Sequence, residues 1–392
     1  MSEWRRVKLE ELYEVHNGLS KARSFFGSGY PFLSFSTVFN NWFLPESLDS
    51  LVQSTTKERE AFSIKRGDVF ITRTSETPEE LGMSSVALKD YPDATFNGFC
   101  KRLRQISDDI VPEFAGYVLR SHDFRSRFYG LAGNMTSRAS LRNDDLLEMT
   151  ISLPPLASQR RIASFLFNYE SAIANCKRQI SLLEEAAMRL YNEWFKAGKG
   201  EKGPISKWFS VSIGRTPPRK VTSYFSTMAD DMLWCSIADI KATNVFVFNT
   251  AEKLTKQALI DSKIHISPMG SVLLSFKLTV GRVAIAAAPL ATNEAIAHFE
   301  TENRALRDYT YCFLHEFPYA TLGSTSAIGT AINSDIVKRI PFIMPTIRDL
   351  ERFSKAVSPV FDAILAFGLQ VRVLAEARDR LLPKLMKGEI AV

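Results

Sequence analysis

Residues 153–195 read LPPLASQRRIASFLFNYESAIANCKRQISLLEEAAMRLYNEWF, and this stretch decides how the rest of the chain is organised. After Pro155 it contains neither proline nor glycine, the two residues that most often break a helix. Its apolar residues form two series with a seven-residue step: Ile162, Tyr169, Cys176, Leu183 and Leu190, and Leu166, Ile173, Ile180, Ala187 and Trp194. Steps that alternate between four and three residues are typical of a coiled-coil seam. The stretch therefore predicts a helix, roughly 50 Å long at about 1.5 Å per residue, that packs along a partner.

A second seam at the other end of the chain favours a helix pair over the alternative, one long core helix in a single globular domain. Its two series are Leu350, Val357, Ile364, Val371 and Leu385, with Arg378 as a polar interruption, and Phe353, Val360, Phe367, Leu374 and Leu381. Thr346 and Asp349 have the Thr-x-x-Asp spacing that caps a helix start. Pro359, Gly368 and Pro383 predict a bend near Pro359 and an end near Pro383. We expect the two helices to form an antiparallel coiled coil.

Composition sets the broad class. At 392 residues the chain is long enough for two domains that each bury a core. The best candidate for a membrane span, residues 280–290, is short and contains Arg282, and the first twelve residues lack the apolar stretch of a secretion signal. The four cysteines have no paired spacing, so we expect a cytoplasmic protein. The net charge of +6 weakly favours a polyanionic partner such as nucleic acid.

The chain repeats one plan, a globular segment followed by a long helix. Five segments recur in the same order; for example, residues 66–89 are matched by 269–286, with Gly67 opposite Gly270, and 137–155 by 329–345, with Pro155 opposite Pro345. We interpret this as an internal duplication of about 190–200 residues. The predicted boundaries are 1–153 for the first globular domain, 154–197 for its helix, 198–204 for a linker, 205–344 for the second domain, 345–386 for its helix and 387–392 for a tail.

The local patterns predict an α/β fold. In the first segment, residues 7–15 have a helical pattern, and strand patterns follow at 29–39, 67–74, 84–90 and 95–104. Residues 112–129 are again helical, and the second segment follows the same order.

The sequence contains no common catalytic or metal-binding motif. There is no P-loop and no G-x-S-x-G, and the five histidines have no second ligand at the spacing of a metal site. Residues 25–29, FFGSG, formally match the F-x-G-x-G of S-adenosylmethionine enzymes, but they follow a polar loop, so a turn is the better interpretation. We therefore expect a recognition module without catalytic residues, metal or cofactor.

The two junctions carry a family resemblance. Residues 151–173 (ISLPPLASQRRIASFLFNYESAI) and 344–364 (MPTIRDLERFSKAVSPVFDAI), with 378–390 (RDRLLPKLMKGEI), resemble the DNA-specificity subunit of type I restriction–modification systems. The resemblance covers essentially the whole chain, although Asp349-Leu350 stands where the first junction has Gln159. It implies two target-recognition domains that each read half of a split DNA sequence, with the antiparallel helices as spacer. It also implies double-stranded DNA, two methyltransferase subunits and motor–nuclease subunits as partners, which supply the chemistry and its cofactors.

Candidate DNA contacts are basic residues in polar loops next to glycine or proline, because phosphates and base edges both need such donors. In the first domain they are Lys21, Arg23, Arg73, Arg138 and Arg142, with Thr72 and Thr74 beside Arg73. In the second domain they are Arg215, Arg219, Lys220, Lys277 and Arg282, with residues 324–330. For each one the alternative is an ordinary solvated side chain. Charged residues off the first seam, at 177, 178, 184, 185 and 189, are the expected docking surface for the methyltransferase.

Three other functions stay open on the sequence alone. One is a specificity protein of a methyltransferase-only or phage-exclusion system, which neighbouring genes distinguish. Another is a diverged DNA methyltransferase or nuclease, which cofactor binding by the isolated chain distinguishes. A third is a pure scaffold, which loss of all DNA binding in the assembled complex favours.

Overall fold

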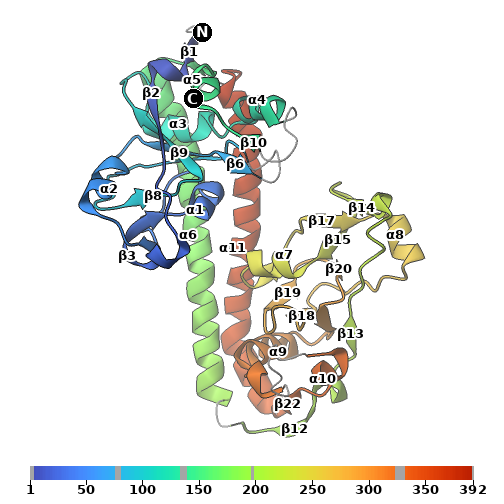
Figure 1. Cartoon of the computed structure of the whole chain (residues 1–392). Coiled ribbons are helices and arrows are strands. Elements are labelled where there is room, and N and C mark those ends of the chain that lie inside the picture. Colours follow the sequence, from blue (N-terminus) through green and yellow to red (C-terminus); the bar gives the residue numbers. More distant parts are fainter. Residues whose placement is uncertain (1–3, 76–80, 133–138, 196–197, 323–331, 391–392) are drawn as a thin grey trace. The chain divides into compact units, whose positions relative to one another are not determined.

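The computed structural model describes residues 4–75, 81–132, 139–195, 198–322 and 332–390 (Figure 1). The chain divides into two compact units, and each is described here by itself. Unit 1 comprises Met1–Ser171 and Ala375–Val392, and unit 2 comprises Ala172–Leu374. Each unit mixes helices and strands and contains one end of helix α6 (Leu156–Phe195) and one end of helix α11 (Ile347–Met386). The predicted α/β class and the two long helices are confirmed.

The main sheet of unit 1 is antiparallel, with the strand order β2-β9-β5-β7. Its strands are β2 (Tyr13–Asn17), β9 (Cys100–Gln105), β5 (Val69–Thr72) and β7 (Ser84–Val86). A smaller sheet contains β4 (Ser50–Val52), β3 (Phe26–Leu33) and β8 (Thr95–Phe96), and two strand pairs join β1 (Arg5–Lys8) to β11 (Thr150–Leu153) and β6 (Thr74–Ser75) to β10 (Ala139–Ser140). The helices are η1 (Leu9–Glu11), η2 (Arg23–Phe25), α1 (Phe35–Asn40), α2 (Thr56–Ala61), α3 (Pro112–Val118), α4 (His122–Ala132) and α5 (Asn143–Leu147).

Strand β5 separates two apolar cores, which explains why all of its residues are buried. Val69 and Ile71 pack with α3, α4 and the ends of α6 and α11, whereas Phe70 faces a second cluster that contains Leu33 and Phe96. Alternate strand residues point to opposite faces, so a run without charged residues fits a strand that is covered on both sides.

Two local predictions in unit 1 are wrong. Residues 7–15 form the end of β1, the short helix η1 and the start of β2 instead of one helix, because β1 pairs with β11 at the far end of the segment. Residues 29–39 are a strand only up to Leu33; Ser34 then caps α1 by accepting the Thr37 N–H. In both places a partner distant in sequence, or a cap, overrides the local pattern.

Unit 2 has a corresponding sheet with the strand order β13-β21-β18-β19-β16. Its strands are β13 (Val211–Ile213), β21 (Ile296–Phe299), β18 (Val272–Ser275), β19 (Val283–Ala286) and β16 (Phe246–Val247). A second sheet contains β14 (Phe225–Ser226), β17 (Glu252–Leu254), β15 (Met232–Cys235) and β20 (Ala291–Thr292). The helices are η4 (Ile205–Lys207), η5 (Thr222–Tyr224), α7 (Ile237–Ala242), α8 (Lys256–Asp261), α9 (Arg304–Glu316), η6 (Tyr319–Leu322) and α10 (Ser334–Lys338).

Part of the predicted linker is ordered structure. Strand β12 (Glu201–Pro204) pairs antiparallel with β22 (Pro341–Met344), the strand that leads into α11. Composition alone does not show this pairing, because the partner strand lies more than a hundred residues away.

Both seams pack as their periodicity predicts within each unit. In unit 2, Ile180 and Ala187 of α6 share a core with Val357 and Ile364 of α11, and the Trp194 and Phe353 rings meet edge to face at 5.9 Å. In unit 1, α6 and α11 share a core through Ile162, Leu166, Leu382 and Leu385. The seam residues are therefore buried or half-buried, as a coiled-coil pattern requires.

Helix α11 begins at its predicted cap and ends at the predicted boundary of residue 386, past the stop expected near Pro383. Thr346 caps it by accepting the Asp349 N–H at 3.2 Å and donating its hydroxyl to the Asp349 carboxylate at 2.7 Å. The helix is continuous through Pro359 and past Pro383 to Met386. Buried neighbours on both sides, such as Val357 and Phe361, hold the helix together where proline removes a main-chain hydrogen bond.

Helix α11 is also long and apolar enough, by composition, to cross a membrane. This differs from the expectation drawn from continuous apolar runs, because α11 mixes its apolar residues with a few charges. In unit 2 the apolar positions Phe353, Val357 and Ile364 are buried in the core.

The polar interruption of the second seam has a partner on the first. Arg378 donates from Nη1 to Glu170 Oε1 at 2.6 Å and lies 5.5 Å from the Trp42 ring, all within unit 1. Both side chains are largely buried, with 15% and 23% exposed. An ion pair therefore replaces an apolar contact at this level of the seam.

We expect Arg378→Leu to destabilise unit 1 by about 2 kcal/mol, because it leaves the Glu170 carboxylate half-buried without its cation. The double variant Arg378→Leu with Glu170→Leu is expected to recover most of this loss, because no charge then remains unpaired. Urea unfolding of both variants measures the effect. Equal stability of Arg378→Leu and the unsubstituted protein contradicts the prediction.

Candidate nucleic-acid interface

Four polar side chains gather at one end of strands β2, β5 and β9 in unit 1, and we call them the Lys101 cluster: Asn17, Arg73, Lys101 and Asn143. Asn17 closes β2 opposite Lys101 of β9, Arg73 follows β5 and Asn143 opens α5. Lys101 Nζ donates to Asn17 Oδ1 at 3.2 Å and also to Asn143 Oδ1. Arg73 Nη1 donates to the same Asn17 oxygen at 3.4 Å.

The Lys101 cluster concentrates positive charge. Lys101 is only 4% exposed, and its hydrogen-bond partners are neutral amides; within the described parts of the chain it forms no ion pair. Burial lowers the pKa of Lys101, and the charge of Arg73 lowers it further. Arg73 Nε is itself buried without a hydrogen-bond partner among the described residues. Cations held in this way attract an anion, and phosphate is the anion that nucleic acid offers.

Among the residues predicted from sequence, Arg73 and Arg142 are brought close together. The Leu141 N–H donates to the Arg73 carbonyl at 3.0 Å, and Arg142, next along the chain, is exposed just before α5. Arg142 therefore lies beside the Lys101 cluster. Arg23 is exposed in η2, and the structure shows no pairing for it with another described residue.

Two predicted contacts are already engaged inside the fold. Lys21 donates to the Gln53 carbonyl at 2.7 Å and pairs with Glu58 at 2.8 Å, which lowers the pKa of the Glu58 carboxyl. Arg219 pairs with Glu252 at 2.8 Å and lies 4.3 Å from the Phe225 ring. These two cations stabilise their own loops, so an approaching phosphate competes with a carboxylate.

The other basic candidates of unit 2 lie on the surface or just below it. Arg215 is exposed and donates to the Ser262 carbonyl at 2.9 Å, and Lys220 is exposed in the same loop. Lys277 is exposed after β18, whereas the Nε of Arg282, at the start of the returning strand, is buried without a hydrogen-bond partner among described residues. Arg138 and residues 324–330 lie outside the described residues.

Sequence reasoning missed Leu278, which stands beside Lys277 at the turn between β18 and β19. It is 98% exposed and has a φ of 60°, a left-handed conformation that is unfavourable for leucine. This turn therefore places an exposed apolar side chain next to a cation, and some DNA-binding proteins insert such apolar side chains between bases.

Sequence reasoning also missed Lys101, Asn17 and Asn143. One signal was available: residues 100–105, CKRLRQ, place three cations beside the apolar residues Cys100 and Leu103 in a strand pattern. A buried strand that carries cations needs partners or a ligand.

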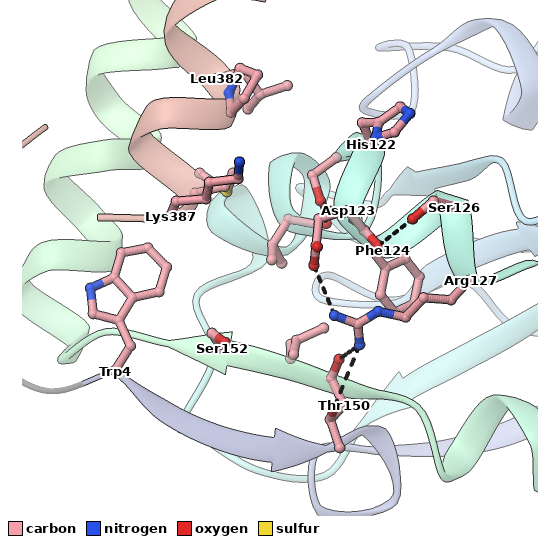
Figure 2. A pocket seen from close by; sticks show the side chains of 15 residues that line it. Trp4, His122, Asp123, Phe124, Ser126, Arg127, Thr150, Ser152, Leu382 and Lys387 are labelled. Carbon is pink, nitrogen blue, oxygen red and sulfur yellow. Dashed lines mark hydrogen bonds and ion pairs between the residues drawn. The ribbon is translucent and has the colours of Figure 1, made fainter. Parts of the chain in front are cut away.

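One pocket in unit 1 contains the residue types of a hydrolytic site without their geometry. A pocket of about 690 Å³ between α4 and the end of α11 is lined by His122, Asp123 and Ser126, the residue types of a hydrolytic triad (Figure 2). The Asp123 carboxylate faces Arg127, which it pairs with at 2.8 Å, and Ser126 donates to the Asp123 carbonyl at 3.0 Å. Figure 2 shows the His122 ring pointing away from both. This arrangement lacks the serine–histidine–carboxylate relay.

One group of side chains in unit 2 could hold a metal ion. His265, His298 and Glu300 offer three ligand atoms within 4.8 Å of one another. The spacing of these residues in sequence did not predict the group, because sheet pairing and a distant loop bring it together.

The described residues define an α/β protein organised around two helices of 40 residues each. Residues 1–185 match the family described as the type I restriction modification DNA specificity domain. The chain is 23% identical over 426 residues to the type I restriction enzyme MjaIX specificity subunit of Methanocaldococcus jannaschii, covering 100% of this chain and 94% of that protein. It is 20% identical over 417 residues to the putative MjaX specificity subunit of the same organism, with the same coverage.

A solved structure shares the fold. The crystal structure of a type I restriction–modification S subunit from M. genitalium has a TM-score of 0.53 and 12% sequence identity, covering 98% of this chain and 96% of that chain. Residues 1–185 therefore match the type I restriction modification DNA specificity domain, and the whole chain is similar to specificity subunits of type I restriction enzymes.

Proposed function

We propose that this chain is the specificity subunit of a type I restriction–modification complex and reads a bipartite DNA target with a fixed spacer, one half-site for each unit. The observation that carries the proposal is the Lys101 cluster, a buried lysine beside an arginine with neutral partners, within the residues that match the specificity domain. Asparagine and lysine side chains are also suited to reading adenine and guanine edges.

Strand register supports a duplicated pair of recognition domains. One cross-strand row contains Val15, Leu103, Val69 and Val86 in unit 1, and its counterpart contains Val211, Phe299, Val272 and Ile285 in unit 2. Gly67 and Gly270 precede these rows with φ angles of 88° and 89°, and their N–H groups donate to Ala87 and Ala286 at 2.9 and 2.8 Å. An internal duplication accounts for two glycines that have the same backbone conformation and the same main-chain hydrogen bond at equivalent positions.

The next row supports different half-sites. In unit 1 it holds Asn17, Lys101, Ile71 and Ser84, and in unit 2 it holds Ile213, Ala297, Leu274 and Val283. The same scaffold position is polar and cationic in one unit and apolar in the other. Two units that differ in this way are suited to two different DNA sequences.

The helices are suited to act as a spacer. In unit 2, Trp194 near the end of α6 contacts Phe353 near the start of α11, and in unit 1 Glu170 contacts Arg378, so the contacts run in opposite directions along the two chains. We infer an antiparallel coiled coil whose length sets the gap in the target, with domain boundaries close to those predicted from sequence.

The partners follow from the same assignment. We infer two methyltransferase subunits, motor–nuclease subunits and a cytoplasmic location, with the reaction and its cofactors supplied by the partners. Of the proposed docking residues on α6, Glu184 accepts the Tyr311 hydroxyl at 2.7 Å and Arg189 pairs with Glu185, so Lys177 and Arg178 are the freer pair for an incoming subunit. A complex with methyltransferase but no nuclease is the second candidate.

The test is to express the chain with its cognate methyltransferase and map modified bases across a genome. We expect one motif made of two short sequences separated by a constant gap. Exchange of residues 172–374 for those of another specificity subunit is expected to change one half of the motif and leave the other unchanged. An undivided motif, or a change in both halves, contradicts the proposal.

A further inference from the structure

A second polar cluster lies in unit 2, and we call it the His298 cluster: His265, His298 and Glu300. His298 belongs to β21, Glu300 follows two positions later on the same face, and His265 lies between α8 and β18. His265 Nε2 and Glu300 Oε1 are 2.6 Å apart, and the two imidazole rings stack with centroids 5.8 Å apart.

Hydrogen bonds hold the His298 ring at both nitrogens. Nε2 lies 2.6 Å from the Thr292 hydroxyl, and Nδ1 lies 2.9 Å from Ser212 Oγ. Ser212 Oγ also donates to Glu300 Oε1 at 3.5 Å, so this hydroxyl lies between the imidazole and the carboxylate. A histidine ligand held through its other nitrogen is the arrangement that metal sites use.

In unit 1, side-chain contacts at the equivalent strand positions hold the strand to a neighbouring segment. The positions of His298 and Glu300 are taken by Arg102 and Arg104, by the strand register given above. Arg102 and Arg104 donate to the Ser63 carbonyl at 2.6 and 2.9 Å, and Arg104 pairs with Asp68 at 2.7 Å. Guanidinium cations thus tie β9 to the segment that follows α2. In unit 2 the equivalent strand positions carry an imidazole and a carboxylate, which a cation can join to the segment that follows α8.

We propose that His265, His298 and Glu300 bind one zinc ion, with water in the fourth position. Two imidazoles and one carboxylate are a ligand set typical of zinc. Ligand distances of about 2.0–2.2 Å place tetrahedral ligand atoms about 3.3 Å apart. The present separations, from 2.6 Å to at most 4.8 Å, bracket this value. Such an ion cross-links β21 to the loop before β18 and stabilises unit 2, a role beyond DNA recognition.

The test uses the full chain, stripped with a chelator and then titrated with zinc chloride alone. We expect one zinc per chain by calorimetry and by elemental analysis after gel filtration, with a rise in the melting temperature of unit 2. His265→Ala and Glu300→Gln remove ligands that are partly exposed, so both variants should fold, and each is expected to weaken zinc binding at least about 100-fold. Thr292→Val removes the hydroxyl that is hydrogen-bonded to His298 Nε2 and is expected to weaken binding about tenfold.

His16→Ala is the matched control, because His16 lies 3.2 Å from Glu14 in an exposed pair of unit 1 and has no second histidine beside it among the described residues. It should bind zinc like the unsubstituted chain. The proposal is overturned if the unsubstituted chain binds no zinc at stoichiometric level. It is equally overturned if His265→Ala and Glu300→Gln bind as tightly as the control, since the pair is then an ordinary histidine–carboxylate contact.

Discussion

Alanine in place of Gly18 or Gly214 is expected to unfold the unit that contains it, at a cost of about 3 kcal/mol or more. A Cβ at Gly18 would lie 2.1 Å from the Asn97 carbonyl oxygen, and one at Gly214 would lie 2.2 Å from the Asn293 carbonyl oxygen. These obstacles are main-chain atoms, which cannot rotate away as a side chain can. The two glycines occupy equivalent places, each just after the first strand of its main sheet.

The turns that the two glycines meet are also equivalent. The Asn97 side chain accepts the Phe99 N–H at 2.7 Å, and the Asn293 side chain accepts the Ala295 N–H at 3.1 Å. The main chains cross there at close range, since Leu19 and Arg215 donate to Phe96 and Thr292 at 2.8 and 2.9 Å. Chemical denaturation and hydrogen exchange of each unit measure the loss.

Gly27→Ala is the matched control in unit 1. Its φ of 97° disfavours alanine, but a Cβ there meets nothing within 4 Å, so only about 1–2 kcal/mol of backbone strain is expected. If Gly18→Ala lowers the free energy of unfolding by no more than Gly27→Ala does, the close approach of the two main chains at Gly18 does not contribute to the stability of unit 1.

Lys101→Met is expected to stabilise unit 1 while weakening DNA binding about tenfold. The substitution removes a buried cation, and the oxygens that it leaves belong to Asn17 and Asn143, which are exposed and can bond to water. Residues that cost stability are typical of functional sites. The lost contact should also flatten the dependence of affinity on salt concentration.

The stability gained by Lys101→Met is expected to depend on pH. Because the pKa of Lys101 is lowered in the folded state, the unfolded chain binds more protons between the lowered value and the ordinary value of 10.5. The stability contribution of Lys101 therefore rises with pH in that window. The advantage of Lys101→Met should be largest at neutral pH and shrink as the pH approaches 10.5.

Lys89→Met is the control, because Lys89 is exposed and paired with Glu46 at 2.6 Å. It should leave both stability and DNA affinity nearly unchanged. Measurements belong on the complex with methyltransferase, using a duplex that contains the mapped target. If Lys101→Met binds DNA as tightly as the unsubstituted protein, the Lys101 cluster is not part of the DNA interface. If the variant is less stable, the contacts of Lys101 stabilise unit 1.

The seam of residues 153–195 was readable from sequence because a helix pair repeats its contacts every seven residues. The Thr346 cap and the buried strand of residues 69–72 were readable for the same reason: their causes lie within a few neighbouring residues. The opening residues 7–15 were misread because a strand is defined by its partner, and β11 lies far along the chain.

The sequence by itself therefore determined the two long helices and the α/β class. Only the tertiary structure decided which polar residues meet. It pairs Lys21 and Arg219 with carboxylates, and it places Lys101 between two asparagines. It also brings His265 to His298 and Glu300. Local structure follows from periodic burial and capping, which a linear pattern records, whereas a site depends on strand pairing between distant residues, which that pattern does not record.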